Sequence, residues 1–179
     1  MKRFLVAAGV SLLVFAALAA AGAQETWRPP EGQEASRAEA AELPAAAASS
    51  ERAKRFVDAL RENKPELGLD FFFPRDVFRR LKAIKDPDRY HRRLLRVYAE
   101  DLAAMRRQLK NPESVQFVSF ELGRQRRWIP RGKEGNAFPY WAAYKSVVTV
   151  KDGEKMRELK MRVMINWGDQ WYVTHLTNK

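Results

Sequence analysis

Residues 159–176 read LKMRVMINWGDQWYVTHL. Apolar and polar side chains alternate through the first half of this stretch, and a period of two predicts a half-buried strand. Gly168-Asp169 then predicts a two-residue turn into a second, antiparallel strand at 170–176. The resulting hairpin is expected to place Val163 opposite Thr174, with one face of both strands in the core.

The same pattern extends upstream of this hairpin. Further strands are expected at about 115–122, 138–150 and 156–167. Asp152-Gly153 predicts the turn between the last two of them, and this turn places Tyr144 opposite Met161. By the same alternation His175 is expected on the outer face of the sheet, opposite Arg162.

The two faces of the predicted sheet differ in what they bury. The core face is expected to carry Phe138, Tyr140, Tyr144, Leu159, Met161, Val163, Ile165, Trp167, Tyr172 and Leu176. The outer face carries an apolar strip formed by Trp141, Met164, Trp171 and Val173. An exposed apolar strip usually marks an interface, so we expect a weak homodimer or an envelope protein partner there. Cover by the N-terminal segment, through Trp27, is the alternative.

Helical signals precede the strands. Helices are expected at about 51–63, from Pro74 to about Ile84, and from Asp86-Pro87 to Asn111-Pro112. The longest helix carries an apolar stripe of Leu94, Tyr98, Leu102, Met105 and Leu109, which should pack on the sheet. The run Phe71-Phe72-Phe73 is too apolar for an open loop and is expected to plug one end of the core.

The N-terminus has the three parts of a secretory signal peptide. Lys2 and Arg3 stand at the start of residues 1–23, an apolar run follows them, and the small residues Ala21, Gly22 and Ala23 end the segment. Cleavage near Ala23 would give a periplasmic or secreted protein, and an uncleaved inner-membrane anchor is the alternative. Residues 24–50, rich in Ala, Glu and Pro, predict a disordered tether, and one α+β domain is expected at 51–179.

Three helices followed by a twisted antiparallel meander, ending in WGDQWYV at residues 167–173, resemble the ketosteroid-isomerase-like, or nuclear-transport-factor-like, α+β cone. Cystatin-like proteins share this plan. The resemblance covers about residues 50–176 and implies a pocket between the helices and a curved, cone-like sheet, and dimers that form through the sheet. The pocket would be lined by Tyr140, Tyr144, Ser146, Trp167, Tyr172 and Thr174. An inner face without a carboxylate or a histidine departs from the enzymes of this superfamily.

The chain is strongly basic, with a formal net charge of +11. Twelve Lys and Arg stand against five Asp and Glu in residues 75–110. Such a surface favours an anionic envelope polymer or lipid headgroups, although solvated helix faces and a flexible loop are the simpler interpretation. The candidate polyanion-binding residues are Arg124, Arg126, Arg127, Trp128, Arg131 and Lys133. Export argues against nucleic acid as the everyday partner.

No catalytic motif, phosphate loop or metal-ligand spacing occurs in the sequence, so no catalytic residue, metal or other cofactor is predicted. Two function classes remain. One is a non-enzymatic binding or interaction module of the cell envelope, and the other is a small-molecule pocket protein or enzyme of the cone fold. A carboxylate facing the pocket would favour the second class, and a pocket closed by side chains would favour the first.

Overall fold

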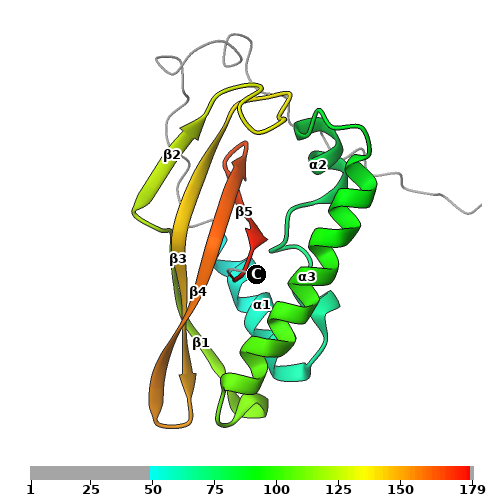
Figure 1. Cartoon of the computed structure of the whole chain (residues 1–179). Helices are drawn as coiled ribbons and strands as arrows, with labels where there is room; N and C mark the ends of the chain where they lie inside the picture. The colour runs from blue at the N-terminus through cyan, green and yellow to red at the C-terminus, as the bar shows by residue number, and fades with distance from the viewer. Residues whose placement is uncertain (1–48, 178–179) are drawn as a thin grey trace, which may run out of the picture.

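The computed structural model describes residues 49–177 and is an α+β structure, in which helices precede an antiparallel sheet (Figure 1). The expected fold class is thereby confirmed, whereas the predicted signal peptide and most of the predicted tether lie outside the described residues. The helices are α1 (Ser50–Glu62), η3 (Pro65–Gly68), α2 (Arg75–Leu81), α3 (Pro87–Gln108) and η4 (Pro112–Ser114). The strands are β1 (Gln116–Glu121), β2 (Gln125–Ile129), β3 (Tyr140–Asp152), β4 (Lys155–Trp167) and β5 (Gln170–His175).

Helix α3 forms as its sequence predicts. The Asp86 side chain caps it by accepting a hydrogen bond from the backbone N–H of Arg89, at 2.9 Å, and Pro87 occupies the first helical position. The predicted apolar stripe is buried along its whole length, from Leu94 to Leu109. The Phe71-Phe72-Phe73 run is also buried, as expected. Helix α2 ends at Leu81, three residues before the expected end, and loop 82–86 follows.

Strand β3 is the centre of the sheet. One edge of β3 pairs with β4. The other edge pairs with β1 along residues 147–151 of β3 and with β2 along residues 140–144. Strand β2 was not among the expected strands, because its charged residues show no alternation of apolar and polar side chains. The chain passes from β1 to β2 at Gly123, where a Cβ would lie 1.9 Å from the carbonyl oxygen of Tyr144.

The turn between β3 and β4 lies one residue later than predicted. Asp152 pairs with Lys155, so Tyr144 lies opposite Val163 and the predicted Tyr144–Met161 pair was wrong. The shift follows from the role of the Asp152 carboxylate, which is buried and accepts hydrogen bonds from the backbone N–H groups of Lys110 and Asn111 at 2.7 and 2.8 Å. A shift of two residues in pairing leaves each side chain on its predicted face.

The turn into β5 is Gly168-Asp169 as predicted, but a β-bulge near Thr174 changes the pairing beyond it. Val163 lies opposite His175, where Thr174 was expected, and the register shifts between Val163 and Met164. The extra residue in a bulge inverts the faces beyond it. His175 therefore lies on the inner face, and its prediction on the outer face was wrong.

The predicted outer strip is mostly part of the core. Met164, Trp171 and Val173 are fully buried within this single chain, and Trp141 is half-buried. The free edge of β5 is also occupied, because Val173 exchanges backbone hydrogen bonds of 2.9 and 3.0 Å with Phe71 and Phe73. The expectation of an exposed strip was therefore wrong. The interface expected at these residues rested on that exposure and loses its support.

Candidate ligand cavity

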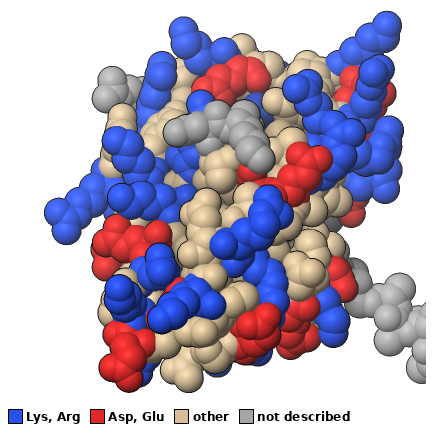
Figure 2. Space-filling view, turned by 60° about the horizontal axis from the view of Figure 1, so that its bottom comes forward, with Lys and Arg blue, Asp and Glu red and all other residues tan. Residues whose placement is uncertain are grey.

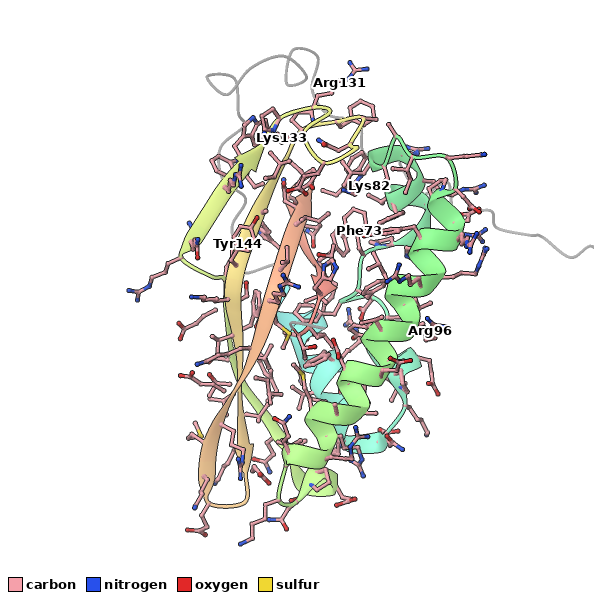
Figure 3. The ribbon with its side chains drawn as sticks, viewed as in Figure 1. Phe73, Lys82, Arg96, Arg131, Lys133 and Tyr144 are labelled. Atoms are coloured by element: carbon pink, nitrogen blue, oxygen red, sulfur yellow. The ribbon has the colours of Figure 1, made fainter. Side chains whose placement is uncertain are left out.

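A half-open cavity of about 400 Å³ lies between α2, the first turns of α3 and the inner face of β3, β4 and β5. Figure 3 shows Tyr144 on the sheet side and Lys82 on the helix side of this region. The apolar part of the lining comes from both layers and consists of Phe78, Leu94, Ala142, Val163 and Ile165. Two helices and three strands thus build a pocket that side chains do not close.

The connection between β2 and β3, residues 130–139, contributes one residue, Glu134, to the lining of the cavity. Asn136 is buried at the centre of this connection, where its side-chain amide donates to the carbonyl oxygens of Pro130 and Phe138, at 3.1 and 2.7 Å. Its amide oxygen accepts from the backbone N–H of Glu134, at 2.9 Å. Two backbone hydrogen bonds of 2.8 and 2.7 Å tie this loop to the end of α2. The loop, expected to be flexible, is therefore held in place beside the cavity.

This loop brings a carboxylate into the cavity. The phenol of Tyr140 donates a hydrogen bond of 2.6 Å to Oε2 of Glu134. Burial raises the pKa of Tyr140, and this hydrogen bond raises it further. Lys82 donates through Nζ to the backbone oxygen of Glu134, at 3.2 Å. Burial lowers the pKa of Lys82, against the opposing effect of the Glu134 carboxylate. An acid, a phenol and an amine thus meet at one end of the cavity.

The bulge in β5 supplies the histidine of the cavity. Nδ1 of His175 lies 3.2 Å from the hydroxyl oxygen of Thr174. Burial lowers the pKa of His175, the positive charges of Arg162 and Lys82 lower it further, and only Asp101 acts in the opposite direction. Because its usual pKa is about 6.5, His175 is uncharged at neutral pH.

The six predicted pocket residues divide equally. Tyr140, Tyr144 and Thr174 line the cavity. Ser146 is instead buried beside β1, where its Oγ accepts a hydrogen bond of 3.0 Å from the N–H of Gly123. The expectation was also wrong for Trp167 and Tyr172, which do not line the cavity although they lie on the same side of the sheet.

These two aromatic residues have other partners. The ring of Tyr172 lies 4.3 Å from the guanidinium carbon of Arg52, which stacks over it from α1. The indole of Trp167 packs edge-on against Phe138, with 6.1 Å between ring centroids. Both side chains therefore stabilise the packing of the sheet and do not line the cavity.

Several lining residues were missed from the sequence, namely Phe78, Lys82, Tyr90, Glu134 and His175. The inner face of the sheet was expected to lack a histidine, and His175 shows that this was wrong; the carboxylate of the cavity, Glu134, comes from the loop between β2 and β3 and not from the sheet face. Tyr90 had a usable signal, because it precedes Leu94 by four residues and extends the apolar stripe of α3 by one turn. Glu134 and His175 had none, since a loop and a bulge place them.

The predicted polyanion-binding residues do not share one surface. Trp128 follows Arg126 by two residues on β2, so these two point to one side and Arg127 to the other. Trp128 packs on Trp141, with 5.4 Å between ring centroids. Arg124 precedes β2, and Arg131 and Lys133 lie in the loop beyond it, at the top of Figure 3. Strand β2 therefore separates the predicted residues, with Arg126 and Arg127 on opposite sides of the strand and the other cations before and after it.

His91 has a structural role. It is buried and its Nε2–H donates to the carbonyl oxygen of Phe73, at 2.8 Å. Within residues 49–177, no three His, Asp or Glu side chains converge as metal ligands would. None of the helices in this range has the length and apolarity needed to cross a bilayer.

Comparison with known proteins returns nothing similar: no family model, no curated protein and no solved structure matches the chain. The cavity is thus the main guide to function.

Proposed function

We propose that this protein is an exported small-molecule pocket protein that holds a small amphiphilic molecule, without converting it, in the cavity between α2, α3 and the sheet. The observation that carries the proposal is the cavity itself, about 400 Å³ in volume and lined by apolar groups with a polar wall at one end. Sites for small molecules in proteins typically measure about 300–1,000 Å³ and share this composition. Support for export comes from residues 1–23.

The apolar lining gives such a ligand its main driving force. Phe78, Ala142 and Ile165 present carbon surface to a space that water otherwise fills. Each Å² of apolar surface removed from water stabilises a complex by about 25 cal/mol. A short alkyl chain or a ring system therefore suits the floor of the cavity. The resemblance to the nuclear-transport-factor-like cone, which we retain as a proposal, implies a pocket in this position.

The polar wall favours a ligand with an electron-rich end. Lys82, Arg162 and the uncharged His175 offer hydrogen-bond donors, whereas Glu134 is the one carboxylate among the lining residues and already accepts from Tyr140. The raised pKa of Tyr140 keeps its phenol protonated at neutral pH. These groups can orient a hydroxyl, carbonyl or anionic group of the ligand.

Calorimetric titration of the purified protein with 1-decanol tests the proposal. Ala142→Phe places a ring in the cavity and should weaken binding at least about tenfold, since it removes the space that the alkyl chain needs. Val118→Phe is the matched control, because Val118 lies on β1, outside the cavity, and is 44% exposed. It should bind as the wild type does. Equal binding by both variants would show that decanol does not enter the cavity.

A second candidate is an enzyme acting on a small molecule. Glu134 and His175 favour it, because they bring a carboxylate and an imidazole to one cavity, and these groups commonly act as general acids and bases. Mass analysis of a ligand that co-purifies with the protein, before and after prolonged incubation, separates the two candidates. An unchanged ligand supports binding alone, and conversion of the ligand supports catalysis.

A further inference from the structure

A second hollow, which we call the arginine groove, runs beside the cavity along α3 and measures about 590 Å³. Its lining consists of Ile84, Asp86, Arg89, Tyr90, Arg92, Arg93 and Arg96. Arg96 is labelled on α3 in Figure 3, well apart from Arg131 and Lys133. On the face of the molecule in Figure 2, Lys and Arg side chains predominate in the upper half.

The four arginines lie on one side of α3: Arg92 and Arg93 are neighbours, and each of them is three or four positions from both Arg89 and Arg96. Like charges at this spacing repel one another and destabilise a helix by a few tenths of a kcal/mol per pair. Within residues 49–177 the structure gives these four side chains one ion pair, a long one of 3.8 Å between Arg96 and Glu100. A bound anion would relieve this repulsion.

The acidic residues near the groove already have partners. Asp86 caps α3 through the backbone N–H of Arg89. Asp88 forms ion pairs of 3.1 and 3.2 Å with Arg75 and Arg79, which lie on α2. Four arginines and one carboxylate, that of Asp86, line the groove, and Asp88 also attracts Arg92, so the groove keeps an excess of positive charge that these acids offset only in part.

The arginine groove and the cavity are adjoining. Tyr90 lines both of them and stacks on Phe78 at the cavity wall, with 5.7 Å between ring centroids. Arg93 lines the groove, and the next residue, Leu94, lines the cavity. Ile84 and Tyr90 are 36% and 40% exposed, so the groove has an apolar lip as well as its guanidinium groups.

We propose that the arginine groove binds the phosphate monoester headgroup of an amphiphile whose apolar chain occupies the cavity. The proposal rests on the proposed function and adds the ligand's chemical class. Guanidinium groups pair with phosphate through two parallel hydrogen bonds. A phosphate monoester carries close to two negative charges and three acceptor oxygens, so it offers more charge and more acceptors to a cluster of arginines than a single carboxylate does.

Calorimetry with decyl phosphate, 1-decanol and methyl phosphate tests this assignment below micellar concentrations. Wild-type protein should bind decyl phosphate at least about tenfold more tightly than either of the other two, because only decyl phosphate engages both hollows. The triple variant Arg89→Gln, Arg93→Gln, Arg96→Gln should lose about tenfold or more in affinity for decyl phosphate. Its affinity for 1-decanol should stay unchanged.

The matched control removes the same number of charges elsewhere. The triple variant Arg124→Gln, Arg126→Gln, Arg127→Gln alters β2 and its approach, away from the groove, and should bind decyl phosphate as the wild type does. Circular dichroism at 25 °C, read alongside each titration, should show that both triple variants keep their helices. A comparable loss of decyl phosphate affinity in the two triple variants would reduce the effect to net charge and overturn the proposal.

The remaining outcomes separate the proposal from the function on which it rests. If the α3 variant binds decyl phosphate like the wild type while Ala142→Phe abolishes 1-decanol binding, the cavity function stands and the headgroup assignment is wrong. If methyl phosphate binds as tightly as decyl phosphate, the groove is a site for free phosphate and the amphiphile is wrong. If Ala142→Phe leaves both decyl ligands unaffected, the proposed function fails, and the amphiphile fails with it.

Discussion

Two neighbouring alanines on β3 allow a direct test of the cavity in the free protein. Ala142 and Ala143 are 2% and 0% exposed, yet only Ala142 lines the cavity. Ala143 points to the opposite side of the sheet, where it pairs with the fully buried Met164. The same substitution at both positions, Ala142→Phe and Ala143→Phe, therefore compares an open space with a filled one.

The expected difference can be estimated from the burial of the new ring. Complete burial of a phenylalanine side chain stabilises the folded state by about 1.5–3 kcal/mol, and overpacking a filled core costs about 1–3 kcal/mol. At Ala142 the ring enters the cavity, so the free energy of unfolding should stay constant or rise by up to about 2 kcal/mol. At Ala143 it should fall by about 1–3 kcal/mol.

Urea unfolding of the two variants and the wild type, followed by circular dichroism, measures both changes. The free energy of unfolding should be about 1–5 kcal/mol higher for Ala142→Phe than for Ala143→Phe. Similar losses at Ala142 and Ala143 would mean that the space beside Ala142 does not accept a ring, and the cavity would have to be abandoned.

Three further predictions concern the sheet, the histidine and the N-terminus. Gly123→Ala should destabilise the protein by more than about 2 kcal/mol in urea unfolding, because the new methyl group would clash with the Tyr144 carbonyl. An unchanged unfolding midpoint would contradict the close approach of Gly123 to the backbone of Tyr144. His175 has a lowered pKa in the folded state, so the unfolded chain binds its proton first as the pH falls. The free energy of unfolding should therefore decrease from pH 7 to about pH 5, and His175→Gln should make that decrease smaller. The same pH profile in the wild type and the variant would show that His175 does not cause it. Protein recovered from the envelope fraction should have an intact mass that corresponds to cleavage after Ala23, and retention of the full mass would refute export with cleavage.

Much of the framework could be predicted because it depends on local signals. Asp86 and Pro87 fix the start of α3, and the spacing of its apolar residues fixes its buried side. Gly168, with φ of 61°, supplies the left-handed conformation that the last hairpin turn requires. The aromatic run at 71–73 reached the core because no open loop can expose three phenylalanines without a large loss of hydrophobic stabilisation.

The parts that escaped prediction depend on contacts between distant segments. Strand β2 has no alternation of apolar and polar residues, and it forms because the edge of β3 is free beside it. The bulge near Thr174 contains no glycine, so the sequence carries no mark of it, and one extra residue was enough to move His175 to the other face. Glu134 is placed at the cavity by its loop, which the Asn136 side chain holds together and which backbone hydrogen bonds of Gly135 and Ala137 join to the end of α2.

The most direct test of the cavity as a ligand site is a nuclear magnetic resonance measurement of contacts between protein methyl groups and bound 1-decanol. Intermolecular Overhauser effects should connect the decanol chain to the methyl groups of Ala142, Val163 and Ile165, which line the cavity from β3 and β4. Effects confined to exposed methyl groups such as those of Leu67 and Val118, which lie outside the cavity, would contradict the proposed function.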